Sequence, residues 1–240
     1  MTNFSISIAL DKRYLNYEIQ KWIYWKPNQT PHILICGATG TGKTYLSRLI
    51  LAKSGEYAKL YLCDFKRDNG FLPFQNAKRY YCFEECQKGL EEVYKLLISR
   101  QKGEQDEIEP VILYFDEWAS YLNHHNKKQA EEEKRKLSNL LMMGRSFEIY
   151  VIVGVQRADA IYFQNARDNF GMRIGLGNLG EEAKNMLFRD FLKEIVLVKG
   201  KGTGYMAIDS EFYQIQTPKI TNIEKLEVSL LKGLGGLKKE

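Results

Sequence analysis

Short apolar runs alternate with longer and more polar segments along most of this chain. Apolar runs bounded by glycine or polar residues predict β-strands near residues 33–36, 58–63, 111–115, 149–155 and 172–175. Segments with apolar residues at helical spacing, or with many charges, predict helices near residues 43–53, 84–101 and 128–143. This alternation predicts an α/β domain whose sheet is mostly parallel and flanked by helices.

The two ends of the chain carry different patterns. Residues 204–208 and 212–215 flank Asp209 and Ser210, which predicts a C-terminal antiparallel β-hairpin. Residues 4–10 alternate like a strand, and the aromatic side chains that follow up to Trp25 are expected to pack in the core. Residues 1–218 are therefore interpreted as one domain on which residues 1–30 pack. Residues 219–240, which turn polar after Pro218, are expected to form a frayed tail.

Composition and charge narrow the possible functions only slightly. The chain has 240 residues, of which 44% are hydrophobic and 27% charged, as in ordinary globular proteins. No apolar run approaches the ~18 residues that span a bilayer, and the first residues lack the pattern of a signal peptide. Direct membrane insertion is therefore not expected, and a cytoplasmic location is. The net charge of +5 permits contact with nucleic acid without arguing strongly for it.

One segment carries a complete phosphate-binding motif. Gly37-Ala38-Thr39-Gly40-Thr41-Gly42-Lys43-Thr44 fits the Walker A pattern, with an apolar strand before it and a helix after it. Its glycines allow backbone N–H groups to point at phosphates, and the helix N-terminus adds favourable partial charge. Lys43 is expected to reach the β- and γ-phosphates of ATP, and Thr44 to place its hydroxyl on Mg²⁺. The motif predicts a P-loop NTPase with a RecA-like sheet.

Polar side chains end two of the later strands. Asp116 and Glu117 follow the apolar run 111–115, which is the Walker B arrangement. Asp116 is expected to hold Mg²⁺ through water, opposite Thr44, and Glu117 to act as the general base for the attacking water. Gln156 follows the run 149–155, so it should face the ligand crevice at the carboxyl ends of the strands and contact both the water and the γ-phosphate. An ordinary surface glutamine is the alternative.

Several segments together resemble the motor domain of the FtsK/SpoIIIE branch of the HerA–FtsK DNA translocases. The segments are Pro31 to Thr44, Leu62-Cys63-Asp64-Phe65-Lys66, Phe115-Asp116-Glu117-Trp118, Met143-Gly144-Arg145-Ser146, Val155-Gln156-Arg157 and Asn169 to Ile174. Phe65 and Ala158 stand where that family has prolines. The similarity covers residues 5–218. The chain resembles a minimal motor as found in plasmid, conjugative-element or phage transfer proteins, because no further DNA-reading domain is visible in the sequence.

The resemblance implies a ring, with hexamers as the family's assembly, in which a neighbouring subunit completes each ATP site. Arg145 matches the family's arginine finger by position, and Gly144 before it favours an exposed helix end. Arg173 on a later strand is the second candidate for this role. The alternative for Arg145 is that it interacts only with the carbonyl groups at the end of its own helix.

The resemblance also implies DNA in the central channel, contacted by basic side chains. Candidates are Arg157 and Arg167, between which Tyr162 and Phe163 are interleaved, and the pair Lys127 and Lys128. For the two lysines a solvated surface is the alternative, because Glu131 to Glu133 follow closely. A membrane-bound or DNA-reading partner protein would have to supply any sequence specificity.

Two other functions remain open at this stage. A P-loop phosphotransferase for a small molecule would need an acceptor pocket and a lid, and enzymes of that class usually lack an acid at the position of Glu117. A nucleotide-switched assembly or export ATPase would hydrolyse ATP slowly, without moving DNA. ATPase activity that depends on DNA separates these alternatives from a translocase.

Overall fold

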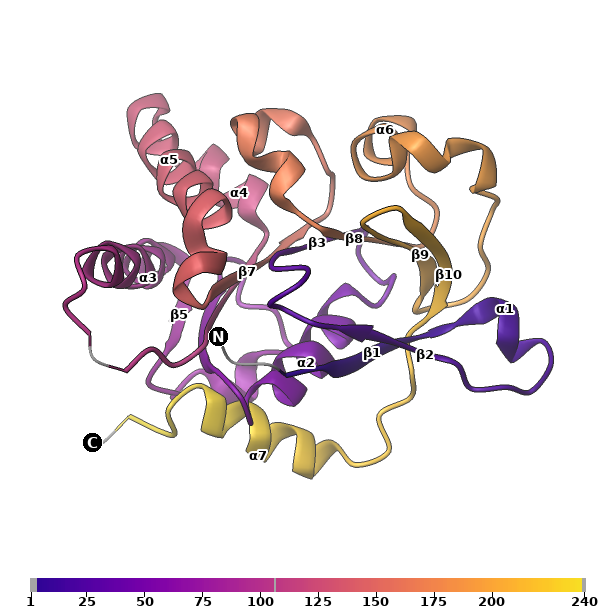
Figure 1. The fold of residues 1–240 in the computed structure, drawn as a ribbon, viewed down its shortest axis with the longest axis horizontal. Helices are drawn as coiled ribbons and strands as arrows, with labels where there is room; N and C mark the ends of the chain where they lie inside the picture. Colours follow the sequence, from indigo (N-terminus) through magenta and orange to yellow (C-terminus); the bar gives the residue numbers. More distant parts are fainter. Residues whose placement is uncertain (1–3, 106, 239–240) are drawn as a thin grey trace.

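A computed structural model describes residues 4–105 and 107–238. The first three residues of the predicted domain and the last two residues of the predicted tail therefore lie outside the described residues. Within the described residues, ten strands form one sheet in the order β2-β1-β10-β9-β8-β3-β7-β6-β4-β5 (Figure 1). The strands are β1 (Ile6–Asp11), β2 (Trp22–Trp25), β3 (Ile33–Gly37), β4 (Lys59–Asp64), β5 (Tyr80–Cys82), β6 (Val111–Asp116), β7 (Ile149–Val155), β8 (Met172–Leu176), β9 (Thr203–Ile208) and β10 (Glu211–Gln216).

The sheet has a parallel half and an antiparallel half. Strands β8, β3, β7, β6, β4 and β5 run parallel to one another. Strands β9, β10, β1 and β2 continue the sheet in antiparallel pairs. The parallel strands are almost entirely buried, as expected when helical crossovers cover both faces of a sheet. Since β3, β6 and β7 are adjacent and parallel, the segments that follow them meet at one edge of the sheet.

Helices cover both faces of the sheet (Figure 1). They are α1 (Lys12–Leu15), α2 (Lys43–Ser54), α3 (Cys86–Gln101), α4 (Trp118–His124), α5 (Lys127–Met143), α6 (Glu181–Phe188) and α7 (Ile223–Gly233). Helices α2 and α7 share one hydrophobic core with the β1–β2 hairpin, whereas α3, α4, α5 and α6 share the core on the opposite face. The predicted α/β fold, with a mostly parallel sheet flanked by helices and a hairpin formed by β9 and β10, is confirmed.

Two expectations for the chain ends are wrong. The chain after Pro218 does not fray, because α7 packs along α2 with Leu226 and Leu230 buried, and Leu237 then bridges to Ala77. The aromatic side chains before residue 26 are only partly in the core. Trp25 is fully buried, but Tyr17 is 78% exposed because it lies on the loop that joins α1 to β2.

Candidate active site

The Walker A segment forms a tight loop between β3, which ends at Gly37, and α2, which begins at Lys43. Gly40 and Gly42 have φ values of 85° and 103°, a region that side chains with a Cβ atom disfavour. A Cβ on Gly37 would lie 2.6 Å from Thr41 Oγ1, and that hydroxyl donates to the carbonyl of Ala38. The glycine spacing is therefore required by the backbone, and it leaves the loop open to phosphate groups.

The loop is also held by the segment that precedes the C-terminal hairpin. The backbone N–H of Gly202 donates to the carbonyl of Thr41 over 2.8 Å, and Gly202 itself accepts from the N–H of Thr217. Gly202 comes so close that a Cβ on Gly42 would lie 3.4 Å from its Cα atom. Lys201 thereby reaches the rim of the same hollow as the P-loop. The antiparallel half of the sheet thus shapes the phosphate site.

Lys43 and the two Walker B acids form a buried ion-pair cluster. Lys43 Nζ donates to Asp116 Oδ1 over 2.6 Å and to Glu117 Oε1 over 2.7 Å. The exposed fractions of these side chains are 8%, 2% and 5%. Tyr114 also donates its hydroxyl to Asp116 Oδ1 over 2.7 Å. The sequence-predicted lysine and acids therefore meet in one site, because the ends of β3 and β6 lie at the same edge of the sheet.

The electrostatics of this cluster keep the lysine charged. Burial alone would lower the pKa of Lys43, but the neighbouring carboxylates of Asp116 and Glu117 raise it above its ordinary value. Burial raises the pKa of Asp116, and the ammonium of Lys43 partly offsets this effect. The lysine charge is available for phosphate oxygens, but in this arrangement it is bound to the two carboxylates.

Asp64 ends β4 directly beside Asp116 on β6. Its carboxylate accepts from the Tyr80 hydroxyl over 2.8 Å and from the N–H of Asp68 over 3.0 Å. Burial raises the pKa of Asp64 to about 6, although these two hydrogen bonds act to lower it. The residue therefore shapes the loop after β4.

That loop contributes two side chains that motif reasoning did not assign. Lys66 Nζ lies 3.1 Å from Glu117 Oε2. The Thr44 hydroxyl donates to Asp68 Oδ2 over 3.2 Å. Both residues line the same hollow of about 300 Å³ as the P-loop and the acids. The available signal was their position just beyond β4, since the ends of neighbouring parallel strands converge.

Gln156 lies where the sequence predicts it. It follows β7, lines the hollow, and its Nε2 atom donates to Thr39 Oγ1 over 3.3 Å. An amide in this position faces the P-loop and can contact a phosphate group. The side chain is exposed in the open hollow.

Arg145 and Arg173 lie away from this hollow. Arg145 is exposed in the 3₁₀ turn Gly144–Phe147, just before β7 begins, whereas the P-loop faces the end of β7. A Cβ on Gly144 would lie 2.5 Å from the carbonyl of Ile149, so the turn depends on a glycine. Arg173 is the second residue of β8, and its buried Nε atom has no hydrogen-bond partner among the described residues. The structure brings neither arginine to the Lys43 site of its own chain.

The candidate DNA-contacting residues are on the surface. Arg157 directly follows Gln156 and forms a loose ion pair with Glu182 at 3.8 Å, with the two side chains 88% and 83% exposed. Arg167 lies in the 3₁₀ turn Gln164–Asn169 and is 3.4 Å from Asp168. Lys127 and Lys128 are exposed at the start of α5. All four are accessible, but only Arg157 directly adjoins the nucleotide site.

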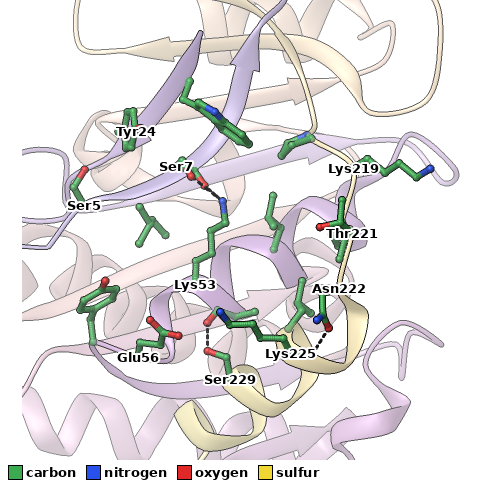
Figure 2. Close-up of a pocket in the computed structure, with 18 residues that line it drawn as sticks. Ser5, Ser7, Tyr24, Lys53, Glu56, Lys219, Thr221, Asn222, Lys225 and Ser229 are labelled. Atoms are coloured by element: carbon green, nitrogen blue, oxygen red, sulfur yellow. Dashed lines mark hydrogen bonds between the residues drawn. The ribbon is translucent and has the colours of Figure 1, made fainter. Parts of the chain in front are cut away.

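A separate hollow of about 490 Å³ lies between β1, β2, α2 and the start of α7 (Figure 2). Lys53 enters it from α2 and donates to the carbonyl and hydroxyl of Ser7 over 2.6 and 2.8 Å. This hollow contains none of the Walker residues, so it is distinct from the candidate active site.

The chain is similar to known proteins. Over 222 residues the chain is 30% identical to the FtsK domain-containing protein YdcQ of Bacillus subtilis (strain 168), which confirms the resemblance to FtsK proteins. The match covers 84% of this chain but only 46% of that relative, so the chain spans about half the relative's length.

Solved structures share the fold. The pCW3 conjugation coupling protein TcpA, in its monomer form with ATPγS, superposes with a TM-score of 0.70 at 21% identity, covering 89% of this chain and 65% of that one. EssC (ATPases 2 and 3) from Geobacillus thermodenitrificans superposes with a TM-score of 0.73 at 15% identity, covering 95% of this chain and 48% of that one. Residues 33–178, from the first residue of β3 to beyond β8, match the ATPase family associated with various cellular activities, AAA. The chain therefore belongs to the AAA family, and it is an ATPase.

Proposed function

We propose that this chain is the motor of an FtsK-type DNA translocase that hydrolyses ATP at the subunit interfaces of a ring. The observation that carries the proposal is the buried Lys43–Asp116–Glu117 cluster beneath a complete P-loop, in a chain with a 30% identical FtsK-domain relative. Glu117 supports hydrolysis in particular, because small-molecule phosphotransferases with a P-loop usually lack this second acid. We expect the motor to work in the cytoplasm.

The roles of the site residues follow from their positions. Lys43 would leave the acids and pair with the β- and γ-phosphates of ATP. Glu117 would take a proton from the attacking water, and Gln156 would contact that water and the γ-phosphate. The oxygen donors of Thr44 and Asp116, with Asp68 beside them, fit Mg²⁺, which prefers such ligands. When bound, Mg²⁺ would neutralise charge on the phosphates.

A partner subunit would complete the site. Arg145 and Gln156 lie beyond opposite ends of β7, which has seven residues, so roughly 20 Å separates them along the strand. Arg145 therefore cannot act on the phosphates of its own chain. Its exposure allows it to reach the site of a neighbouring subunit, and Arg173 is the second candidate for this role.

Mixed rings test this role. Rings of Arg145→Ala alone and of Lys43→Ala alone should be inactive, but a mixture should recover ATPase activity at interfaces that pair an intact Lys43 with an intact Arg145. Mixtures of Lys43→Ala with Glu117→Gln are the matched control. They should not recover, because both residues belong to the same subunit's site. Full ATPase activity of rings made of Arg145→Ala alone would show that Arg145 takes no part in hydrolysis.

The translocase proposal itself is tested by DNA-stimulated ATPase activity. Single- and double-stranded DNA should each be added to the chain, and at least one should increase turnover. Replacing Arg157 and Arg167 together by alanine should weaken DNA binding on all sequences alike. It should also flatten the salt dependence, since each lost phosphate contact changes the slope of log K against log salt by ~0.9 on duplex DNA.

Lys95 and Lys102 provide a matched control for that double replacement. They too are exposed and paired with acids, the half-buried Glu91 and the exposed Glu104, so their replacement removes the same charge from another surface. Exposed pairs of this kind contribute ~0–1 kcal/mol to stability, so both double variants should remain folded. ATPase activity that no DNA changes would favour the nucleotide-switched assembly or export ATPase instead.

A further inference from the structure

Glu117 is held by a lysine at each of its carboxylate oxygens. Lys43 Nζ lies 2.7 Å from Oε1, and Lys66 Nζ lies 3.1 Å from Oε2. The two lysines differ in environment, because the Lys43 side chain is 8% exposed whereas that of Lys66 is 42% exposed. Lys43 approaches from the P-loop, and Lys66 approaches from the loop after β4.

Only one of these two contacts can persist when ATP binds. The Lys43 ammonium faces the hollow that takes the phosphates, and phosphate oxygens compete with the two acids for it. Once Lys43 turns to the nucleotide, Oε1 of Glu117 loses its cation. A carboxylate that is 5% exposed cannot rely on water to replace that partner. Lys66 is then the cation that remains on Glu117.

The loop that carries Lys66 is fixed on both sides. The N–H of Asp68 donates to Asp64 Oδ1, and Asp68 Oδ2 accepts from the Thr44 hydroxyl. Arg67 has a φ of 53°, a conformation that a residue with a Cβ adopts only when its surroundings impose it. A Cβ on Gly70 would lie 2.6 Å from Thr44 Cγ2, so the loop closes tightly against the P-loop helix. Lys66 therefore emerges from an anchored backbone beside the site.

We propose that Lys66 is a positioning residue that holds Glu117 Oε2 during hydrolysis, so that Oε1, released by Lys43, faces the attacking water. The inference rests on the proposed role of Glu117 as the general base. The water oxygen forms a bond to the γ-phosphorus while the bond from phosphorus to the β–γ bridging oxygen breaks, and its electron pair stays on ADP. Glu117 Oε1 takes the water proton, and Lys66 keeps all its protons throughout.

Steady-state kinetics and analogue binding test this role in the full chain. Lys66→Met should lower kcat about 10- to 100-fold, because the base is no longer held in place. KM for ATP, and the affinity for a non-hydrolysable ATP analogue, should stay within about threefold of wild type, since the phosphate contacts of Lys43 remain. Lys66→Arg should recover most of kcat, because it restores the cation on Oε2.

Lys59→Met is the matched control, since Lys59 begins the strand that Lys66 follows and pairs with the exposed carboxylate of Glu109, away from the nucleotide hollow. It should leave kcat and KM unchanged. Thermal melting of each variant separates a loss of fold from a loss of turnover. In a Glu117→Gln background, Lys66→Met should cause no further loss of kcat, because both changes act on one carboxylate.

Three results would overturn the inference. If Lys66→Met keeps the wild-type kcat, then Glu117 does not depend on Lys66 after Lys43 has turned to the nucleotide. A raised KM at unchanged kcat would show that Lys66 binds phosphate directly. An additional loss in the Glu117→Gln background would show that the two residues act separately. A failure of the proposed role of Glu117 as general base would be recognised separately, because Glu117→Gln would then hydrolyse ATP at the wild-type rate.

Discussion

Gly154 offers a way to disturb the acid cluster without changing any residue in it. The residue lies on β7, between the Asp116 end of β6 and the middle of β3. A Cβ atom there would lie 2.5 Å from Asp116 Oδ1, 3.0 Å from the Tyr114 hydroxyl and 3.5 Å from Lys43 Nζ. Since non-bonded atoms prefer separations of about 3.5 Å, the Asp116 carboxylate has to move by roughly 1 Å in Gly154→Ala.

The size of the effect follows from what that carboxylate holds. Asp116 accepts from Lys43 over 2.6 Å and from Tyr114 over 2.7 Å, so a shift of roughly 1 Å disrupts both contacts. Overpacking of this kind costs about 1–3 kcal/mol of folding free energy. A misplacement of about 1 Å in an active site can reduce turnover about 100-fold. We therefore expect Gly154→Ala to fold with reduced stability and to hydrolyse ATP about 100-fold more slowly.

Gly175→Ala separates this site-specific effect from general overpacking. Gly175 lies on β8, the strand on the other side of β3, and its added Cβ would meet Leu179 Cδ1 at 2.5 Å and Phe188 Cε2 at 2.9 Å. That variant should lose comparable stability in urea denaturation but keep turnover within a few-fold of wild type. Wild-type turnover in Gly154→Ala would refute the reasoning. Equal losses of turnover in both variants would show that the effect does not arise at Asp116.

Three further predictions concern binding and stability. Lys43→Ala should abolish tight ATP binding in a calorimetric titration, because it removes the cation that faces the phosphates and that also pairs with Asp116 and with Oε1 of Glu117. Burial lowers the pKa of His32 to about 3, so stability should be full above pH 6.5 and fall below it by ~1.4 kcal/mol per pH unit. Asp64, with its pKa raised to about 6, opposes that loss below pH 6, so His32→Asn should be compared with wild type at each pH in chemical denaturation. Leu230→Ala, at a fully buried position of α7, should cost about 2–5 kcal/mol, whereas Val228→Ala, 68% exposed, should cost under ~0.5 kcal/mol.

The parallel part of the fold could be predicted because its signals are local. Each of its longer strands is a short apolar run, and the Walker A glycines occur where the backbone needs positive φ, at Gly40 and Gly42. The meeting of Lys43 with Asp116 and Glu117 also follows from sequence, since parallel strands bring their carboxyl ends to one edge. The short strand β5 was not predicted, and the order of the strands could not be, because pairing is set by contacts distant in sequence.

The additional side chains of the site could not be predicted with the same security. Lys66 and Asp68 lie in a loop whose path depends on Asp64 accepting a backbone N–H and on Thr44 donating to Asp68. Such hydrogen bonds join residues from separate segments and leave no periodic pattern in the sequence. A lysine just after a strand end can equally lie in solvent, and only its distance to Glu117 Oε2 separates the two possibilities.

The C-terminal helix was missed because short-range signals there conflict. Glycines at 233, 235 and 236 and several charges favour a frayed end, but in the structure Gly233 and Gly235 lie in close contact with neighbouring residues. A Cβ on Gly233 would lie 2.7 Å from the Cα atom of Gly55, so α7 approaches the end of α2 where only glycine fits. Glu227 on α7 also pairs with Arg48 over 2.8 Å, and Arg48 lines the nucleotide hollow from α2. The helix that begins at Lys43 is thus supported along its far side by the last segment of the chain. Removing α7 would therefore uncover the side of α2 that α7 packs against, and we expect the P-loop, which leads into α2, to be held less firmly as a result.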